Sequence, residues 1–504
     1  MNRRDFLKVL GASGGVAATQ SAALRRVLAH SQPGSFLPTV AIERDPVLHA
    51  INRLTYGPTP DLVAHVQAIG VEAFINEQLA PELIADSALE RRLAPMTTLT
   101  QTAGELAAEY EGSGNGFQVR SHLIAATLLR EIYTQRQLYE RMVEFWTGHF
   151  SIYLGDILSG FLKVDDDRDV IRPHALGRFR DLLGASAHSP AMLVYLDNAT
   201  SRKEAPNENY ARELMELHTL GVDGGYTETD VKEVARCFTG WTINPIRRRF
   251  DDGSEILTFR YQATFHDDGE KTVLGQTIPA GGGMRDGELV LDILASHPST
   301  AKFIATKLVR RFVADDPPQS LVDACAATFL QSDGDIRSVL RTLFGAAEFW
   351  DAAPKFKRPL EYTVSVMRAL NYDIQDWQAF SRPAFTVLLG MGQVPFNRET
   401  PDGYPDVQEE WTDNLLTRWN IAIAAAHGGI PGAQASLKPL LEANNIPIEA
   451  EPILNFFAGL LYGRGLTSTE TTSILNYVAT DPTNVEVLQD ALALLMAAPA
   501  FQYR

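Results

Sequence analysis

The segment 206–221 carries the densest group of side chains in this chain that could do acid–base chemistry. At about 100° per residue, Glu208, Arg212 and Glu216 recur at i, i+4 and i+8 on one helical face, with Glu213 beside them. Two carboxylates at this spacing can reach one guanidinium, and two carboxylates held close together can turn one of them into a general acid. We therefore predict Glu208, Arg212, Glu213 and Glu216 as candidate catalytic residues.

Three interpretations of this polar face stay open at the level of sequence. The face is solvated, or it forms an ion-pair network with the next helix, in which Arg212 and Arg236 pair with Glu213 or Glu216. In the third interpretation it lines a pocket where a carboxylate acts as a base or binds a metal, and Arg236 is then a further candidate catalytic residue. Spacing along the chain does not give the distances that would separate the three.

Two histidines lie in otherwise apolar helical arcs. His149 shares a face with the apolar side chains of its predicted helix, whereas Glu140 and Glu144 point elsewhere. A lone histidine in such a place is usually a core residue whose ring nitrogens are satisfied, although His149 is also a candidate catalytic residue. If the faces of His149 and His218 meet, the two rings are candidate ligands of a metal or an axial cofactor, with Glu216 within reach.

A second polar cluster follows a strand signal and reads His266-Asp267-Asp268-Gly269-Glu270-Lys271. We expect a polar hairpin turn, with His266 and Asp267 as candidate ligands of a divalent cation, although the spacing of an EF-hand loop is absent. The acidic run 165–169 and the basic run 355–358 are expected to stay in water. The cofactor is left unknown, because the sequence contains no P-loop, no dinucleotide fingerprint and no C-x-x-C-H haem motif.

The elements that must position these residues have mainly helical periodicity. The fold class predicted is a mainly α, multi-helix globular protein with one small β-hairpin insertion near 256–278, where β-branched and aromatic residues alternate. The clearest predicted helices cover residues 60–79, 131–150, 178–187, 286–296, 300–313, 360–371, 414–427, 452–461 and 484–497.

The central prediction concerns two consecutive helices. Segment 207–221 is expected to be a two-faced helix with its apolar side inward, and its charged groups are expected to meet segment 227–241. Thr227 and Asp230 suit the N-cap and the third position of the second helix, where each side chain can bind the other's backbone N–H.

The first residues are typical of an export address. Asn2 to Lys8 read Asn-Arg-Arg-Asp-Phe-Leu-Lys, as in a twin-arginine signal, and a Gly- and Ala-rich apolar run continues to Leu24. Val27-Leu28-Ala29 fits a cleavage site, so residues 1–29 are predicted to be a removed signal peptide. The G-x-S-x-G pattern at 11–15 lies inside it and is not interpreted as a nucleophile elbow. We expect export by the twin-arginine translocase to the periplasm or the medium.

Composition narrows the class of protein. The 504 residues carry a net charge of −17, which argues against nucleic acid as a partner because phosphate binding needs a basic surface. No segment after the leader is apolar enough for stable membrane insertion. Cys237 and Cys325 are too few for a disulfide framework, and whether they are bridged is left open. Residues 30–504 are predicted to form one large helical domain, with a soft boundary near 355–359.

The central motif carries a family resemblance. The chain resembles the bacterial "domain of unknown function 1800" family over nearly all of the part that follows the leader. The resemblance rests on Asn207-Glu208-Asn209, Ala211-Arg212-Glu213, Glu216, Thr219-Leu220-Gly221, Tyr226-Thr227-Glu228, Asp230-Val231, Ala235-Arg236 and Thr239-Gly240-Trp241. It extends to Arg53-Leu54-Thr55-Tyr56-Gly57-Pro58-Thr59, Phe145-Trp146, His149-Phe150, His266-Asp267, Gly269, Lys271, Lys302-Phe303 and Lys307-Leu308.

The resemblance implies no established activity. It implies export, and it implies a gene neighbour that encodes a second exported protein with a sulfatase-like or phosphatase-like appearance. The loop 401–405 departs from the Pro-Asn-Val-x-Gly-Trp-Pro segment expected of the family, which puts any function of that loop in doubt. Two hypotheses follow: an exported enzyme with a Glu/Arg/His pocket around the central helix, or a non-catalytic partner or scaffold of a co-exported sulfatase-like protein.

Overall fold

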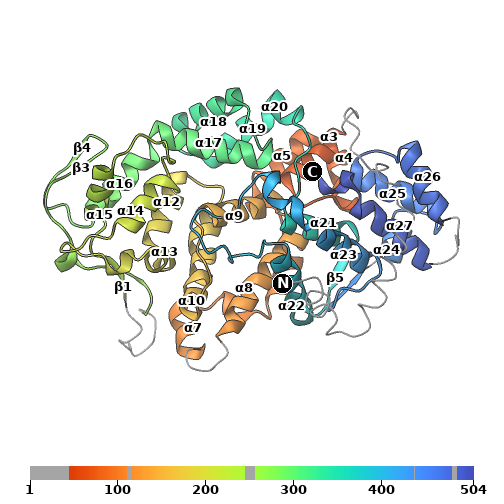
Figure 1. The fold of residues 1–504 in the computed structure, drawn as a ribbon, viewed down its shortest axis with the longest axis horizontal. Coiled ribbons are helices and arrows are strands. Elements are labelled where there is room, and N and C mark those ends of the chain that lie inside the picture. Colours follow the sequence, from red (N-terminus) through yellow and green to blue (C-terminus); the bar gives the residue numbers. More distant parts are fainter. Residues whose placement is uncertain (1–44, 111–115, 245–255, 436, 479–484) are drawn as a thin grey trace.

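The computed structural model describes residues 45–504 except 111–115, 245–255, 436 and 479–484, so the predicted leader lies outside the described residues (Figure 1). Helices dominate, as the periodicity predicts, and the strands of the described ranges form three two-stranded antiparallel pairs. None of the helices in these ranges is long and apolar enough to cross a membrane.

Several helices in the first half of the chain begin at proline or at a capping side chain. In α3, for example, Pro46 takes the first turn and the Asp45 carboxylate accepts a hydrogen bond from the Val47 N–H at 2.8 Å. The helices up to the central motif are α3 (Pro46–Leu54), α4 (Pro60–Ile69), α5 (Val71–Gln78), α6 (Ser87–Leu93), α7 (Ala103–Tyr110), α8 (Phe117–Tyr133), α9 (Gln137–His149), α10 (Ile157–Asp165), α11 (Arg172–His174), α12 (Phe179–His188) and α13 (Pro190–Tyr195).

The helices of the middle are α14 (Glu208–Glu216), α15 (Glu228–Cys237), α16 (Arg285–Ala295), α17 (Pro298–Phe312), α18 (Gln319–Gln331), α19 (Ile336–Gly345) and α20 (Ala347–Trp350). Those of the last part are α21 (Pro359–Ala369), α22 (Trp377–Gly390), α23 (Leu415–Ala426), α24 (Leu437–Ala443), α25 (Ala450–Tyr462), α26 (Ser468–Val478) and α27 (Val485–Ala497). The predicted helix 131–150 is thus two helices, α8 and α9, separated at 134–136.

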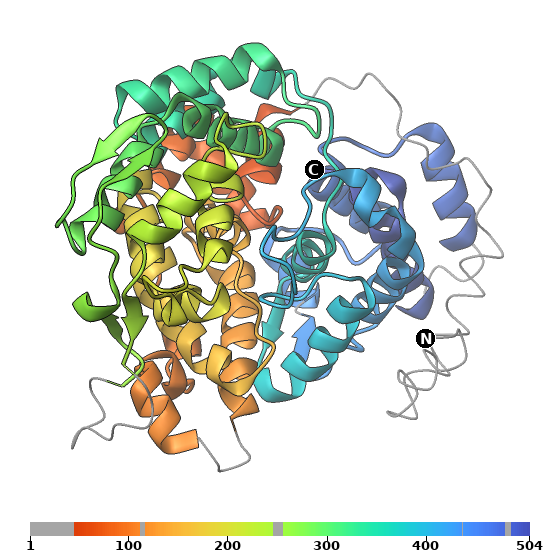
Figure 2. The same cartoon turned by 60° about the vertical axis from the view of Figure 1, so that its left-hand side comes forward.

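The molecule has two hydrophobic cores. Figure 2 shows the last part of the chain, in blue, gathered beside the helices of the first part. The first core takes its buried residues from segments between Leu48 and Ala352. The second is built mainly from Leu360 onward, and α8 contributes to it from the other half of the chain. The polypeptide passes from one core to the other near 355–359, where the soft boundary is predicted. That residues 30–504 form one large domain stays a prediction.

The strands confirm a small β insertion but pair differently in detail. The predicted strand β2 (Phe259–Tyr261) pairs with β1 (Trp241–Ile243), which follows α15 directly. The returning segment instead closes on itself as β3 (Lys271–Val273) and β4 (Gln276–Ile278), joined by a turn in which Gly275 has φ +76°. A third pair, β5 (Tyr372–Ile374) with β6 (Ala433–Ala435), lies in the second core.

The central motif forms the predicted helix pair, but α14 ends at Glu216 and residues 217–220 form a turn where the predicted helix continues to Gly221. Helix α14 buries Tyr210, Ala211, Leu214 and Met215 and packs against α15. Thr227 and Asp230 form the expected capping box at the start of α15. Both cysteines are buried and free, so Cys237 and Cys325 are not bridged in this structure.

Candidate functional site

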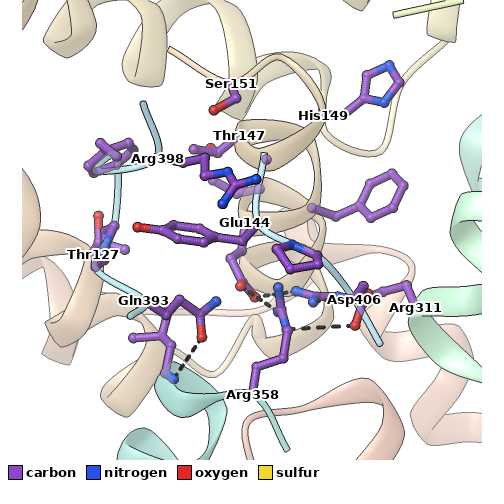
Figure 3. Close-up of a pocket in the computed structure, with 18 of the residues that line it drawn as sticks. Thr127, Glu144, Thr147, His149, Ser151, Arg311, Arg358, Gln393, Arg398 and Asp406 are labelled. Carbon is purple, nitrogen blue, oxygen red and sulfur yellow. Dashed lines mark hydrogen bonds and ion pairs between the residues drawn. The ribbon is translucent and has the colours of Figure 1, made fainter. Parts of the chain in front are cut away.

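A cavity of about 250 Å³ lies along α9, between the two cores. Its walls come from α8, α9 and α17, from the start of α21, and from the loop 393–406 that follows α22. Figure 3 shows Glu144 on the α9 wall, with Arg311 and Arg358 reaching it from other elements and His149 further along the helix.

Helix α9 has two buried faces, which the sequence did not predict. Met142 and Trp146 pack into the first core. On the opposite side Glu140, Glu144 and Gly148, spaced by four residues, line the cavity. Glu140 and Glu144, which the helical wheel places away from the apolar face, therefore point towards buried partners and not towards solvent.

Glu144 is the centre of a buried ion-pair network. One carboxylate oxygen pairs with the Arg311 guanidinium, and the other accepts a hydrogen bond from Arg358 at 2.6 Å. The Tyr56 hydroxyl donates a further hydrogen bond to Glu144 at 3.1 Å, and Asp406 lies 3.4 Å from Arg311. Burial raises the pKa of Glu144, and the Arg311 charge opposes that shift.

A second carboxylate, Glu361 on α21, ties this network to the end of the chain. It lies 2.8 Å from Arg141 and 3.3 Å from Arg504, and it caps α21 by accepting the Arg358 backbone N–H at 2.9 Å. Burial alone would raise the pKa of Glu361, but the guanidiniums of Arg504, Arg141 and Arg311 outweigh it and lower that pKa to about 2.

A third group of charges, Glu140, Asp167 and Arg172, also lines the cavity. Arg172 forms a bidentate pair with Glu140, at 2.9 and 2.7 Å, and also binds Asp167 at 2.8 Å. Asp167 belongs to a π-helical turn, Asp166–Ile171, that joins α10 to α11. Such turns add one residue to a helix and re-aim its side chains, and they are frequent at functional sites. Here the turn directs Asp167 to the cavity.

Glu131, on α8, differs from every other carboxylate in the cavity wall. Its side chain is fully buried, and neither carboxylate oxygen has a hydrogen-bond partner among the described residues. Burial, and after it the charges of Glu144 and Glu140, raise the pKa of Glu131 well above its usual value. This environment favours the protonated form of the carboxyl group.

His149 and Lys307 form a hydrogen-bonded pair in the cavity wall. The His149 Nε2 lies 3.0 Å from the His218 carbonyl oxygen, which only accepts, so Nε2 carries the ring proton. The Nδ1 atom is then the acceptor for the Lys307 ammonium at 2.9 Å. Burial, and then the Lys307 charge, lower the pKa of His149 well below its usual value, which keeps the ring neutral.

The pKa of the Lys307 amine is lowered, which makes this amine more reactive. Burial, assisted by the neighbouring Arg310 charge, lowers its pKa to about 8. The cavity wall has six cationic residues, of which four pair with carboxylates: Arg172, Arg311, Arg358 and Arg398. Across the described part of the chain, no carboxylate lies within ion-pair distance of Lys307 or Arg310. These two residues sit one turn apart on α17, so one wall of the cavity carries two positive charges that form no ion pair, and Asp406 and Asp402 act on Lys307 only from a greater distance.

The loop 393–406 closes the cavity by lying directly on α9. At Gly403 an added Cβ would come within 2.1 Å of the Gly148 carbonyl oxygen, and the backbone has φ +73°, so both contact and conformation require glycine. Phe396, another cavity residue of this loop, has φ +62°, which is a strained conformation for an aromatic residue. The loop that departs from the family's expected segment is thus an integral wall of the cavity.

The predicted α14 residues lie outside this cavity. Arg212 forms a bidentate pair with Glu228 of α15, with both distances 2.7 Å, and lies 3.7 Å from Glu208. Their exposure is substantial, with 67% of the Glu228 side chain accessible. Glu216 accepts a hydrogen bond from Tyr226, and Glu213 approaches the cavity only as far as the loop residue Asp402, whose charge helps to raise its pKa after burial and Glu216. The expected partnership of Arg212 with Glu213 or Glu216 is not the one formed.

Arg236 has other partners than those predicted. It pairs with Glu233 at 2.9 Å and with Asp267 at 2.8 Å, and so fastens α15 to the hairpin. His266 is buried, and its ring lies 2.8 Å from the Thr239 carbonyl oxygen and 3.2 Å from Asp286. The cluster is a structural joint between α15, the hairpin and α16.

The candidate metal ligands do not assemble. His149 and His218 are neighbours, with ring centroids 6.0 Å apart, but both nitrogens of His149 are engaged. No group of three or more His, Cys, Asp or Glu residues in the described ranges has the geometry to hold a metal ion, which applies also to His266 and Asp267.

Two predictions about charged runs are wrong. Lys355, Lys357 and Arg358 were expected in water, but all three are buried. Asp166 and Asp167 of the acidic run are also buried, because the π-helical turn directs them inward. The sequence reasoning therefore missed most of the cavity, including Lys307, which was noted only as part of the family resemblance.

Fold and site together define a mainly α-helical protein with a polar cavity between two cores. The chain belongs to the family described as "Protein of unknown function (DUF1800)", whose sequence profile matches residues 49–503. Comparison with curated proteins and with solved structures gives no match.

Proposed function

We propose that the protein is an exported enzyme that acts on small anionic substrates in the cavity along α9. The observation that supports this is the pair of unpaired cations, Lys307 and Arg310, in a cavity whose other cations are all neutralised. Both side chains are partly buried, and their hydrogen-bond partners, the Asp315 carbonyl oxygen for Arg310 and the His149 ring for Lys307, carry no negative charge. An anionic ligand supplies the missing charge. A volume of about 250 Å³ suits a small molecule.

The roles follow from the positions. Arg310 binds the acid group of the substrate, since its forked guanidinium suits carboxylate and phosphate oxygens. Lys307 is the reactive group, because an amine with a pKa of about 8 is partly neutral at physiological pH. His149, predicted as catalytic, acts as a positioning residue that fixes the Lys307 amine. In this proposal Glu208, Arg212, Glu213, Glu216 and Arg236 are structural.

Binding of small anions tests the proposal. Acetate, malonate, sulfate and phosphate are titrated into the purified protein while its thermal unfolding is followed. At least one should stabilise the wild type in a saturable manner. Stabilisation should be lost in Arg310→Gln and kept in Arg212→Gln, which removes an arginine from the α14 surface. Equal effects in both variants, or no stabilisation by any anion, would exclude the site.

Turnover separates an enzyme from a binding protein. Conversion of a bound acid by the wild type should be lost in Lys307→Arg, while anion binding is retained because the charge is kept. Binding without conversion of any acid in a broad panel would favour the alternative, a non-catalytic partner of a co-exported sulfatase-like protein. Co-purification of such a protein from a periplasmic extract tests that alternative directly.

The cellular location is a separate part of the proposal. The Arg3–Arg4 pair and the apolar run behind it support export by the twin-arginine route to the periplasm or the medium. Replacing both arginines by lysine should leave the protein in the cytoplasm at full length. Unchanged fractionation of this variant would contradict the export proposal.

A further inference from the structure

The Lys307 amine is held in a geometry that suits attack on an electrophile. It contacts the acceptor Nδ1 of His149 at 2.9 Å, and its Nζ lies 5.4 Å from the centre of the Phe303 ring. No carboxylate among the described residues is close enough to stabilise its charged form as an ion pair. The His149 ring cannot turn to release this contact without losing its Nε2 bond to the His218 carbonyl. The amine is therefore fixed at the cavity wall.

Burial and a neighbouring positive charge together make the Lys307 amine more reactive. Burial lowers the pKa of the Lys307 amine, the Arg310 charge three residues on along α17 acts in the same direction, and the charges of Asp406 and Asp402 oppose both without cancelling them. With a pKa of about 8, roughly a tenth of the amine is neutral at pH 7. A lysine that is desolvated and placed beside another cation is the arrangement that activates an amine as a nucleophile towards carbonyl compounds.

We propose that Lys307 forms an imine with the carbonyl carbon of a small oxo acid whose acid group is bound by Arg310. This inference rests on the proposed function and specifies its substrate class. The neutral amine attacks the carbonyl carbon, so that a C–N bond forms and the π electron pair moves to the oxygen. The two amine protons leave with that oxygen as water, which gives the C=N bond. No oxidant or reductant is consumed.

The surroundings favour this chemistry over simple proton transfer. The His149 ring has a strongly lowered pKa, so it orients the amine without removing its proton. Thr147 and Ser151 lie on the same side of the cavity as His149, and Arg398 reaches towards α9 from the loop (Figure 3). These groups can bind the oxygen that leaves as water and a second polar group of the substrate.

Reductive trapping tests the proposal on the full chain. Glyoxylate or pyruvate is added near neutral pH with cyanoborohydride, which reduces the imine to a stable secondary amine. Peptide mass mapping should place the adduct on Lys307, in amounts about tenfold or more above Lys302, an exposed lysine of the same helix, because the neutral fraction follows the pKa. Lys307→Arg should abolish the adduct at this position.

One further variant, tested with a charged and an uncharged carbonyl compound, separates binding of the acid group from reactivity of the amine. Arg310→Gln should reduce trapping of glyoxylate by about tenfold or more, the loss of one charge-assisted contact. Trapping of uncharged acetaldehyde should fall much less, because it loses only the share of neutral Lys307 amine that the Arg310 charge provides. Labelling of Lys302 and Lys307 to the same extent, or absence of any adduct, would overturn the imine. If anions still stabilise the wild type but no adduct forms, the imine fails while the anion site stands. If anions also have no effect, both proposals fail.

Discussion

The charged clusters on α14–α15 and around α9 use the same residue types in opposite surroundings. The Arg212–Glu228 pair lies at the surface, with most of the Glu228 side chain accessible. The Arg311, Glu144 and Glu361 side chains lie in the interior, where each charge depends on its neighbours. A high density of charged residues in the sequence therefore identifies the polar face of a helix. It does not show whether those charges are exposed, as on α14 and α15, or buried, as around α9.

The largest expected effect comes from removing a buried carboxylate. Glu361→Gln leaves the guanidiniums of Arg141 and Arg504 without their counter-charge, so it should destabilise the fold by about 3 kcal/mol or more. Urea unfolding measures the difference. Glu228→Gln, the matched change on the surface, should leave the unfolding midpoint indistinguishable from that of the wild type. Similar costs for both would break the distinction between the clusters.

The next effect concerns the loop that closes the cavity. Gly403→Ala should lower the free energy of unfolding by about 1–2 kcal/mol, because alanine disfavours the left-handed backbone conformation at this position. The contact of the new methyl group with Gly148 should also displace the loop. Gly275→Ala has a similar φ, +76°, but open space around the new methyl group, so it isolates the backbone cost.

Hydrogen exchange of the segment 393–406 separates the two consequences. Exchange in this segment should rise in Gly403→Ala alone, and anion stabilisation should fall with it. A Gly403→Ala variant that matches Gly275→Ala in both respects would show that the loop is not held against α9.

The pH dependence of stability probes Glu131. Its pKa is raised in the folded state, so between the unfolded and folded values only the folded protein holds this proton. Stability contributed by this group is complete below about pH 4.5 and is lost as pH rises, by up to about 1.4 kcal/mol per pH unit. Glu131→Gln should flatten the decline relative to the wild type.

Urea unfolding at a series of pH values provides the curves for this comparison. The exposed Glu90→Gln variant is the control and should run parallel to the wild type. Parallel curves for Glu131→Gln as well would mean that Glu131 is ionised in the fold, which its buried and unpartnered carboxyl group argues against.

The smallest effect is expected on α14. Arg212→Gln should cost less than about 1 kcal/mol, and the cost should shrink further in high salt, because exposed pairs are screened. Thermal unfolding at low and high salt measures it. A large loss of stability that does not depend on salt would mean that the α14 charges depend on one another as strongly as the buried charges around α9.

Local patterns predicted the fold class and the central helix pair well. Apolar periodicity placed α14 with the correct buried face, and Thr227 and Asp230 placed the start of α15, since both signals depend on neighbours along the chain. The partner of β2 was not predictable in the same way, because β1 comes from a segment that precedes the strand signal.

The cavity could not be predicted, because its parts are distant in sequence. Glu144 meets Arg311 and Arg358 only after α9, α17 and α21 have packed. A run such as Lys355 to Arg358 has the composition of a solvated segment, and its burial depends on carboxylates from other elements. One signal was available: three glutamates at 140, 144 and 361 lie in helices whose opposite faces are strongly apolar.

The titration of Lys307 tests the central claim most directly. Brief acetylation at a series of pH values, read by peptide mass mapping, gives the midpoint of this one amine, with Lys302 as the exposed internal control. We predict a midpoint near pH 8 for Lys307 and protection by any anion that stabilises the protein. A midpoint near the ordinary lysine value of 10.5, or labelling that bound anions do not reduce, would contradict the claim that this amine is a reactive group in an anion site.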